Sequence, residues 1–171
     1  VQLAGFGRTV VGGDRDPAWA RVIAEAFSEA GLDAGVRKDI SRELWSKVVV
    51  SACINPLTAA LRVPNGTLLV NPTICRLVSE VAKECVRVAA AEGQELSERQ
   101  SIAYVRRVTK HTSRNHSSML QDIERGRRTE ISMINGAICR YAAKRGIPVP
   151  LNSTLVAIVE SLERTTASEK G

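Results

Sequence analysis

The sequence predicts a mainly α-helical fold preceded by a short βαβ-like segment. Hydrophobic residues make up 44% of the 171-residue chain but aromatic residues only 4%, a composition that favours helices packed through aliphatic side chains. From Asp39 onward, helix start and stop signals follow one another, with no strand pattern between them. Only the first 38 residues contain short β-branched runs bounded by turn residues.

The βαβ-like segment occupies residues 1–38. Residues 8–13 are predicted to form a strand, because Arg8-Thr9-Val10-Val11 is largely β-branched. Asp16 and Pro17 predict a helix start with Asp16 as N-cap, and Gly31 predicts its end. Residues 33–37 are expected to form a second strand. The apolar face of the helix is expected to consist of Val22, Ile23, Ala26 and Phe27. Two strands cannot bury a sheet on their own, so this segment is interpreted as the edge of a larger α/β domain.

The glycines near the start do not match a dinucleotide-binding loop. That loop needs G-x-G-x-x-G between a strand and a helix, and the third glycine position after Gly5 and Gly7 is Val10. The residues that follow favour a strand rather than a helix. A turn followed by a strand is therefore expected here.

Three helix starts are clear in the first half of the remaining chain. Asp39 is expected to cap a long helix that ends near Leu61. Asn71-Pro72 predicts a second helix, closed by Gly93, and Ser97-x-x-Gln100 is a capping box for a third.

The second half predicts three more helices. Ser118-x-x-Gln121 is interpreted as a capping box for a short helix that stops at Gly126. A helix is expected over residues 129–145, with Gly136 in its middle compensated by close approach of another helix. Asn152 is predicted to cap the last helix, which ends near Arg164 and is followed by a frayed polar tail.

The charge of the chain does not by itself indicate a nucleic-acid partner. The net charge is +6 and the pI about 9.5, but Lys and Arg are scattered along the predicted helices. The one denser patch, Arg125-Gly126-Arg127-Arg128, is accompanied by no nucleic-acid-binding motif. No nucleic-acid partner is expected.

The cysteines and histidines indicate neither disulfides nor a metal site. Each of the four cysteines lies in an apolar helical stretch, and none forms a CxxC pair, which is typical of reduced residues in a cytoplasmic protein. The two histidines, His111 and His116, do not combine with them at metal-ligand spacing. No apolar run of 18 residues and no signal peptide is recognised, so neither a membrane span nor export is predicted.

A polar stripe interrupts the apolar stretch from Trp45 to Thr58. Lys47, Ser51 and Asn55 are spaced by four residues and therefore lie on one face of a helix that is otherwise expected to be buried. In one interpretation Lys47 extends to solvent while Ser51 and Asn55 bond neighbouring backbone. In the other, Lys47 lies in a cleft, where burial lowers its pKa and makes it a usable general acid.

A second polar group surrounds the short predicted helix, from Asn115 to Asp122 and then from Gly126 to Glu130. Taken singly, Ser118 is explained as an N-cap, and Glu130 as a first-turn carboxylate that the helix dipole favours. These structural explanations stay open beside a functional one.

Two blocks and a linker, in this order, resemble the ketopantoate reductases (2-dehydropantoate 2-reductases). The first block contains Trp45-x-Lys47, Ile54-Asn55-Pro56-Leu57-Thr58 and Pro64-Asn65-Gly66. The second contains Ser117-Ser118-Met119-Leu120-Gln121-Asp122, Thr129-Glu130-Ile131 and Ile134-Asn135-Gly136. The linker is Gly146-Ile147-Pro148-Val149-Pro150-Leu151-Asn152. The resemblance covers residues 8 to about 164.

The resemblance implies a two-part organisation. Residues 39–171 would form the all-helical C-terminal domain, of the 6-phosphogluconate-dehydrogenase-like type, which binds substrate. Residues 1–38 would be the C-terminal edge of an incomplete Rossmann domain, and the missing part of that domain would hold most of the NADP cofactor.

The resemblance also assigns roles. Lys47 would hydrogen-bond the keto oxygen and donate a proton as hydride arrives from the nicotinamide. Asn55, Asn115 and Ser118 would bind the carboxylate and hydroxyls of the substrate. Glu130 would support turnover through contact with the cofactor ribose and the substrate region.

One position departs from the family pattern. The family often has Asn four residues after the lysine, and here that residue is Ser51, which is shorter and lacks a second donor. The expected function is the substrate-binding and catalytic half of an NADPH-dependent reductase of ketopantoate, inactive without its nucleotide domain. The first alternative is a stand-alone helical dimerisation or interaction module without redox activity. The second is a reductase of another 2-keto acid. A homodimer through the helical domain is also expected.

Overall fold

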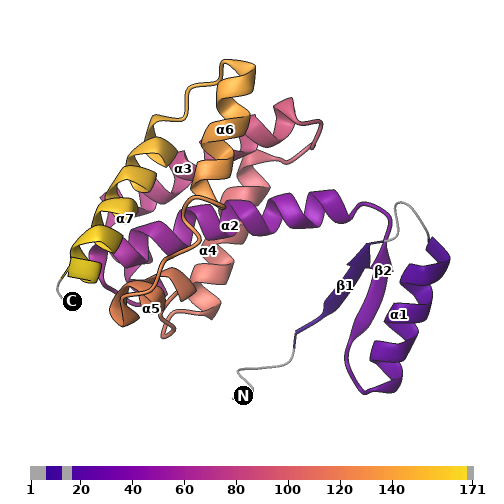
Figure 1. Cartoon of the computed structure of the whole chain (residues 1–171). Coiled ribbons are helices and arrows are strands. Elements are labelled where there is room, and N and C mark those ends of the chain that lie inside the picture. Colours follow the sequence, from indigo (N-terminus) through magenta and orange to yellow (C-terminus); the bar gives the residue numbers. More distant parts are fainter. Residues whose placement is uncertain (1–6, 13–16, 169–171) are drawn as a thin grey trace. The chain divides into compact units, whose positions relative to one another are not determined.

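The structure, a computed structural model, describes residues 7–12 and 17–168. Contacts within the chain divide it into two compact units, Val1–Leu44 and Trp45–Gly171 (Figure 1). The predicted turn at Gly5 and the predicted helix cap at Asp16 lie outside the described residues. The boundary between the units falls inside a helix, a few residues after the domain boundary between residues 38 and 39 that the sequence predicts. The functional identity of the two parts stays a prediction.

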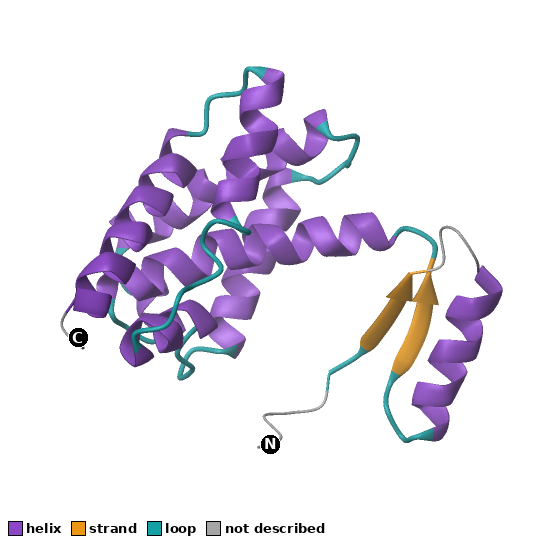
Figure 2. Ribbon diagram, viewed as in Figure 1, coloured by secondary structure: helices purple, strands orange, loops and turns teal. Residues whose placement is uncertain are grey.

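The first unit is a βαβ element, as the sequence predicts. Strand β1 (Thr9–Gly12) pairs in parallel with β2 (Ala34–Arg37), and helix α1 (Pro17–Glu29) connects them (Figure 2). Gly12 ends β1 where the chain packs closely on Ile40, since a β-carbon at Gly12 would lie 2.7 Å from Ile40 Cγ2. Only a residue without a side chain fits there.

Helix α1 buries a different face from the predicted one. Ala20 and Ala24, one turn apart, are its buried residues. Two strands cover only this narrow alanine stripe, so the larger side chains of the helix stay outside the contact. The predicted apolar face is exposed among the described residues: Val22 is 55% exposed, Ile23 42% and Phe27 39%, and Ala26 is also exposed.

The second unit is built from helices. Its elements are α2 (Ile40–Leu61, which starts in the first unit), the 3₁₀ helix η1 (Asn65–Leu69), α3 (Pro72–Ala91), α4 (Glu98–His111), α5 (Ser118–Arg125), α6 (Asn135–Arg145) and α7 (Pro150–Ser168). The mainly α-helical fold predicted from composition and capping signals is confirmed.

Helix α2 supplies much of the main core. Its buried residues run from Val49 to Ala59 and include Ala52, Cys53 and Leu57, which pack against aliphatic residues of α3, α4, α6 and α7. A smaller cluster joins the end of α2 to α5, α7 and the segment before α6. Its members are Ala59, Met119, Ile123, Ile131 and Val159. The two clusters together hold α2 against the other helices of this unit.

Three predicted helix starts are confirmed by their caps. Asn71 Oδ1 accepts from the backbone N–H of Thr73 (2.8 Å) and Ile74 (3.4 Å), and Pro72 follows as the first helical residue of α3. Ser97 Oγ accepts from the backbone N–H of Gln100 at the start of α4 (3.4 Å). Asp39 Oδ1 also accepts from the backbone N–H of Arg42, as expected of a cap for α2.

Helix α5 starts one residue earlier than the sequence predicts. Ser117, not Ser118, is the N-cap, and its Oγ accepts from the backbone N–H of Leu120 (3.1 Å). Ser118 is the first helical residue, so the explanation of Ser118 as a structural cap is wrong. The predicted stop is confirmed, because Gly126 adopts a left-handed conformation with φ of 68°.

The predicted start of α6 is also wrong. Helix α6 begins at Asn135 rather than Thr129, so Glu130 lies in a turn and not in a first helical turn. Gly136 is near the start of α6, and a β-carbon at this position would meet atoms of Ile131, Ser132 and Arg140 at ordinary contact distances. The three nearest neighbours of such a β-carbon thus come from residues 131–140 and not from the other helix whose close approach the sequence predicts.

Helix α7 begins at Pro150 and runs to Ser168, past the end predicted near Arg164. Asn152 lies inside this helix and is completely buried. It is therefore not the N-cap that the sequence predicts. The cap comes from another helix, as described below.

Candidate functional site

The predicted polar stripe lies on α2, with its first member at the surface. Lys47 is exposed, and Ser51 and Asn55 are half-buried, whereas the residues between them contribute to the core. Within the described residues Lys47 therefore extends to solvent, as in the first of the two interpretations, and its catalytic role stays a prediction. The stripe runs from solvent at Lys47 to the partly covered Asn55.

All six candidate side chains lack a partner inside the described part of the chain. Neither a hydrogen bond nor an ion pair joins any of their side chains to the described residues. These side chains belong to Lys47, Ser51, Asn55, Asn115, Ser118 and Glu130. The interpretation in which Ser51 and Asn55 bond neighbouring backbone is therefore not supported. Polar groups in this state can bind water or a ligand.

A hydrogen bond between two buried hydroxyls joins the two sequence blocks. Thr58 Oγ1 donates to Ser117 Oγ at 2.7 Å, although 59 residues separate them in the sequence. Asn55 precedes Thr58 by one helical turn, and Ser118 follows Ser117 directly. The contact therefore brings the end of the α2 stripe beside the start of α5.

The loop before α5 is held by a second contact with the first block. The backbone N–H of Asn65 donates to the carbonyl of Asn115 (3.0 Å), and that of Gly66 donates to the carbonyl of Ser113 (3.0 Å). A β-carbon at Gly66 would lie 2.7 Å from Ser113 Cβ, so this approach requires glycine. Asn115 is thereby placed next to the turn that follows α2.

Asn65 has a property that sequence reasoning did not single out. Its side chain is only 6% exposed, and its Nδ2 donates to Thr112 Oγ1 at 2.9 Å. Its Oδ1 is buried and has no partner among the described residues. A buried acceptor without a partner is costly, so a ligand or water donor at this atom would be stabilising. The Pro64-Asn65-Gly66 turn was the available signal.

Glu130 is fixed by its neighbours rather than by its own side chain. The backbone N–H of Thr129 donates to Glu163 Oε1 of α7 at 2.6 Å, and Thr129 Oγ1 accepts from the backbone N–H of Ile131 (3.2 Å). The carbonyl of Glu130 accepts from the backbone N–H of Met133 and Ile134. The backbone on both sides of the exposed Glu130 carboxylate is thus held in place.

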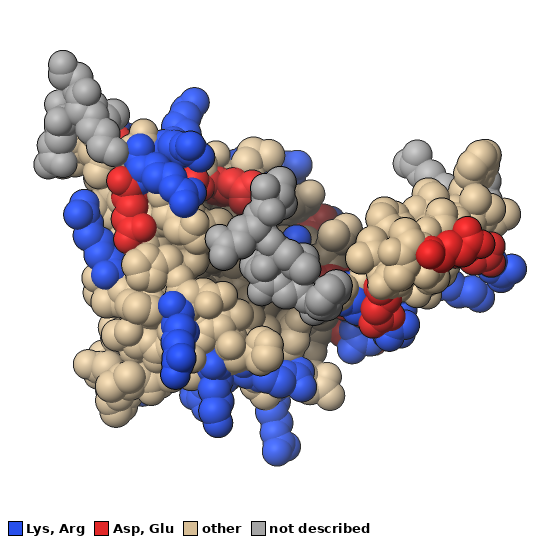
Figure 3. All heavy atoms as spheres, turned by 90° about the horizontal axis from the view of Figure 1, so that it is seen from below, with Lys and Arg blue, Asp and Glu red and all other residues tan. Residues whose placement is uncertain are grey.

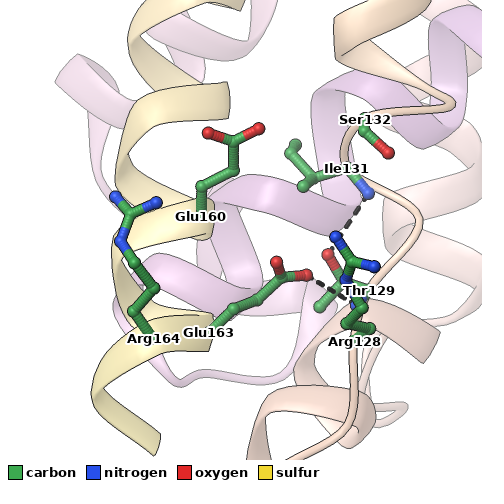
Figure 4. Close-up of a pocket in the computed structure, with 7 residues that line it drawn as sticks. All are labelled: Arg128, Thr129, Ile131, Ser132, Glu160, Glu163 and Arg164. Atoms are coloured by element: carbon green, nitrogen blue, oxygen red, sulfur yellow. Dashed lines mark hydrogen bonds between the residues drawn. The ribbon is translucent and has the colours of Figure 1, made fainter. Parts of the chain in front are cut away.

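A hollow of about 430 Å³ lies between this segment and α7. Figure 4 shows Glu163 pointing from α7 toward Thr129 in the segment that carries Arg128 to Ser132, and Glu160 and Arg164 of the same helix also line the hollow. None of the six predicted site residues lines it. The hollow holds both acidic and basic groups, and its carboxylate Glu163 is engaged with the backbone of Thr129. We interpret the hollow as part of the contact between α7 and the segment that carries Glu130, which the Glu163–Thr129 hydrogen bond fixes.

A buried polar network, which sequence reasoning missed, crosses the core. Glu84, only 3% exposed, accepts from the backbone N–H of Leu151 and Asn152 (3.0 Å each) and thereby caps α7. Asn152 Nδ2 donates to Glu84 Oε2 at 2.7 Å, and Asn152 Oδ1 accepts from Asn135 Nδ2 at 3.0 Å. Asn135 Nδ2 also donates to the carbonyl of Ala52 on α2 (3.0 Å). A chain of hydrogen bonds thus runs through α3, α7, α6 and α2.

The four cysteines are free, and two of them are fully buried. Burial raises the pKa of the Cys85 thiol to about 12, and burial, with a smaller contribution from Cys85, raises the pKa of Cys53 well above its usual value. Both thiols stay neutral at physiological pH and are not nucleophiles. Among the described residues, no group of three or more His, Cys, Asp and Glu side chains is placed to hold a metal ion.

Basic side chains lie at several separate places on one face of the protein. On the face shown in Figure 3, Lys and Arg side chains occur at both edges of the larger unit, and the few acidic side chains lie at one of these edges. The patch at Arg125, Arg127 and Arg128 is exposed and follows α5. It lies in the same segment as Glu130, so it adds positive charge near the candidate site.

Helix α2 is long and apolar enough to cross a membrane by length and composition alone. Core helices pass the same test, and eight residues of α2 are buried against the other helices described above. Packing therefore accounts for its apolar composition.

Comparison with known proteins gives a family match over most of the chain. The family model described as "Ketopantoate reductase PanE/ApbA C terminal" matches residues 39–163. A 2-dehydropantoate 2-reductase of Archaeoglobus fulgidus is 41% identical over 165 residues, covering 95% of this chain and 55% of that protein. The corresponding enzyme of Halobacterium salinarum is 39% identical, covering 96% of this chain and 54% of that protein. The chain spans about half the length of the curated relatives it matches.

Solved structures show the same fold. A ternary structure of D-mandelate dehydrogenase with NADH and anilino(oxo)acetate superposes with a TM-score of 0.92 at 32% identity, covering 97% of this chain and 70% of that one. A PanE/ApbA family ketopantoate reductase from Ralstonia eutropha JMP134 gives a TM-score of 0.88 at 31% identity, covering 96% of this chain and 54% of that one. Together with the family match over residues 39–163, these likenesses show that the chain belongs to the ketopantoate reductase family and contains its all-helical C-terminal domain.

Proposed function

We propose that the chain provides the substrate-binding and catalytic groups of an NADPH-dependent 2-dehydropantoate 2-reductase. One observation carries this proposal. The six polar side chains that the family pattern points to have no partner among the described residues, whereas the neighbouring polar groups Thr58, Ser117 and Asn135 bond one another or the backbone. Internal bonds fix the scaffold, and the six side chains are left to meet a ligand.

In this proposal Lys47 is the general acid. Reduction of a 2-keto acid adds hydride to the keto carbon and leaves negative charge on the oxygen. An ammonium group beside that oxygen stabilises the charge and gives up a proton to form the hydroxyl. The exposed Lys47, at the solvent end of the stripe, can take up a replacement proton from water.

The remaining groups orient the substrate. The amides of Asn55 and Asn115 and the hydroxyls of Ser51 and Ser118 offer donors to a carboxylate and a hydroxyl. The Thr58–Ser117 and Asn65–Asn115 contacts bring three of these residues, Asn55, Asn115 and Ser118, into one region. Such an arrangement suits a small, anionic, polar molecule.

The carboxylate of Glu130 fits the hydroxyls of a cofactor ribose, since a carboxylate accepts two hydrogen bonds and Glu130 is exposed on a fixed turn. A bound nicotinamide cofactor supplies the hydride. Most of its contacts, and the preference for NADP, are proposed to lie in a nucleotide-binding domain joined to the first unit. We further propose a cytoplasmic location, in keeping with four free cysteines.

Reduction of a different 2-keto acid is a second candidate. Ser51 stands where the family often has asparagine, and the structural likeness to D-mandelate dehydrogenase reaches a TM-score of 0.92. A shorter side chain at this position leaves more room beside the substrate. The candidate substrates are therefore ketopantoate first and 2-keto acids with a larger apolar substituent second.

The test is an NADPH-oxidation assay with ketopantoate and with an aromatic 2-keto acid. It is run on the chain and on the chain joined to any native sequence upstream of Val1. Oxidation with ketopantoate in the longer form supports the reductase, and faster oxidation with the aromatic acid supports the second candidate. No oxidation with either acid, in a folded protein that binds NADPH, would contradict both and would favour an interaction module that forms a homodimer.

A further inference from the structure

Pro56 interrupts the hydrogen-bond ladder of α2. Proline has no backbone N–H, so the carbonyl of Ala52, four residues earlier, loses its partner within the helix. Ala52 is completely buried, so water does not replace the missing donor. An unpaired carbonyl in the core is costly, and a helix relieves that cost by bending.

Asn135 supplies the missing donor. Its side-chain amide Nδ2 donates to the carbonyl of Ala52 at 3.0 Å, and Asn135 is itself completely buried. The residue comes from the start of α6, 83 positions along the chain from Ala52. The gap that Pro56 makes in one helix is therefore closed by a side chain from another.

The direction of the Asn135 amide is fixed by Glu84. Both side-chain oxygens of Glu84 accept from backbone N–H groups of α7, and Glu84 Oε2 also accepts from Asn152 Nδ2, which leaves Asn152 Oδ1 to accept from Asn135. Asn135 must then point its own Nδ2 toward both Asn152 and Ala52. Its Oδ1 is left buried without a partner among the described residues.

The Ala52 carbonyl that Asn135 bonds lies between two proposed substrate-binding residues. Ser51 directly precedes Ala52, and Asn55 directly precedes Pro56. The angle between the turn that carries Ser51 and the turn that carries Asn55 is set where the ladder is interrupted. A change in the partner of the Ala52 carbonyl would rotate one of these side chains relative to the other.

We propose that Asn135 is a positioning residue for the keto-acid site, fixing the turn of α2 between Ser51 and Asn55 by bonding the carbonyl that Pro56 leaves open. Glu84 acts through Asn152 to hold Asn135 in the required orientation. The functional part of this inference rests on the proposed function. The link between Asn135 and Pro56 is independent of it.

A double-mutant cycle tests the link in the full chain. It is measured by urea unfolding and does not require enzyme activity. Pro56→Ala restores a backbone N–H for the carbonyl of Ala52, so Asn135→Ala should lower the urea midpoint of unfolding much less in the Pro56→Ala background than in the native one. The matched control is Thr109→Ala, which removes another buried side chain whose Oγ1 bonds only the backbone of its own helix, α4. Its effect should add to that of Pro56→Ala. Additive behaviour of Asn135→Ala would overturn the link.

Steady-state kinetics test the positioning role in whichever form of the protein reduces a 2-keto acid. Asn135→Ala should raise KM for the acid about fivefold to tenfold, the loss that corresponds to one misplaced hydrogen bond, with KM for NADPH unchanged. Pro56→Ala added to it should return KM toward the native value. Native KM in a destabilised Asn135→Ala protein would overturn the positioning role, as would a KM that Pro56→Ala does not restore.

The two failures can be told apart. If no 2-keto acid is reduced by the native protein, the proposed function fails, while the unfolding cycle still reads the coupling between Asn135 and Pro56. If the native protein is active but the cycle is additive, the proposed function stands and the inference fails. If the Asn135→Ala protein does not fold, the test is whether the Asn135→Ala/Pro56→Ala protein folds. The link predicts that it does, and an unfolded double variant would overturn the link.

Discussion

Glu163 holds the backbone of Thr129 at 2.6 Å across 34 residues of sequence, and so fixes the turn that presents Glu130. We expect Glu163→Ala to lower kcat about fivefold to tenfold, because the loss of one charge-assisted hydrogen bond lets the Glu130 turn move. Steady-state kinetics of the active protein provide the measurement. Glu160→Ala is the matched control, since Glu160 lines the same hollow one turn earlier and should leave kcat unchanged. Equal effects of the two variants would contradict the role of Glu163.

Replacement of Lys47 separates chemistry from folding. Lys47→Ala should reduce kcat by a factor of about 10² to 10⁴, the usual contribution of a general acid. Lys47→Arg should not restore it, because a guanidinium keeps its proton at neutral pH. Since Lys47 is exposed, the midpoint of thermal unfolding should hardly change. A variant that turns over at the native rate would rule out Lys47 as the acid.

The length of the side chain at Ser51 is expected to affect the choice of substrate. Ser51→Asn adds a second donor and fills space on the polar face of α2. We expect kcat/KM for ketopantoate, divided by kcat/KM for an aromatic 2-keto acid, to rise about fivefold, as for one added hydrogen bond. Both acids are assayed with the same enzyme preparation, so the ratio is independent of the active fraction. An unchanged ratio would show that Ser51 does not contact the part of the substrate that differs.

Alkaline pH should destabilise the fold through the buried thiols. Burial raises the pKa of Cys85 to about 12 from its usual 9.0, so the folded state keeps a proton that the unfolded chain loses. Stability from this group is complete below pH 9 and is lost as pH rises toward 12. Between pH 8 and 10.5 the loss for Cys85 is about 2 kcal/mol in the free energy of unfolding.

Urea titrations at pH 8 and 10.5 measure this loss. Cys85→Ala removes the titrating group and should make the difference between the two pH values smaller. Some pH dependence should remain, because burial also raises the pKa of Cys53. An equal difference in the native chain and in Cys85→Ala would show that the thiol does not contribute.

Local signals are sufficient where a helix is capped by its own neighbours. Asn71 caps α3 and Ser97 caps α4 as the sequence predicts, because each side chain needs to reach only two or three residues along the chain. The prediction for α5 is one residue off because two consecutive serines, Ser117 and Ser118, lie at the start of the helix. The glutamine three residues after Ser118 favours the wrong one.

Local signals fail where the cap or the break depends on a distant residue. Glu84 caps α7 from 67 residues away, so Asn152, which looks like a cap in the sequence, is free to enter the helix. The helix expected from Thr129 begins only at Asn135. Before it, the backbone bonds are irregularly spaced: Met133 and Ile134 donate to the carbonyl of Glu130, and Gly136 donates to that of Ile131. Glu163 of α7 holds the start of this segment through the backbone N–H of Thr129. Such contacts exist only after the helices have packed.

The candidate site can be predicted only where it depends on local sequence signals. Spacing alone places Lys47, Ser51 and Asn55 on one face of a helix, and α2 is helical through all three. Composition cannot show that Lys47 is exposed, since the apolar run around it resembles a buried helix. Composition also cannot show that Asn135 bonds the carbonyl of Ala52. Pro56 does indicate that this carbonyl lacks its usual partner within the helix.

The bond between Asn135 and Ala52 constrains which residues can change during evolution of the family. A proline at position 56 makes an amide at position 135 necessary, and that amide requires a properly oriented partner at position 152. A relative that replaces the proline would release the other positions from this constraint. Across the family, positions 56, 135, 152 and 84 should therefore vary together rather than one at a time, even though they belong to four different helices.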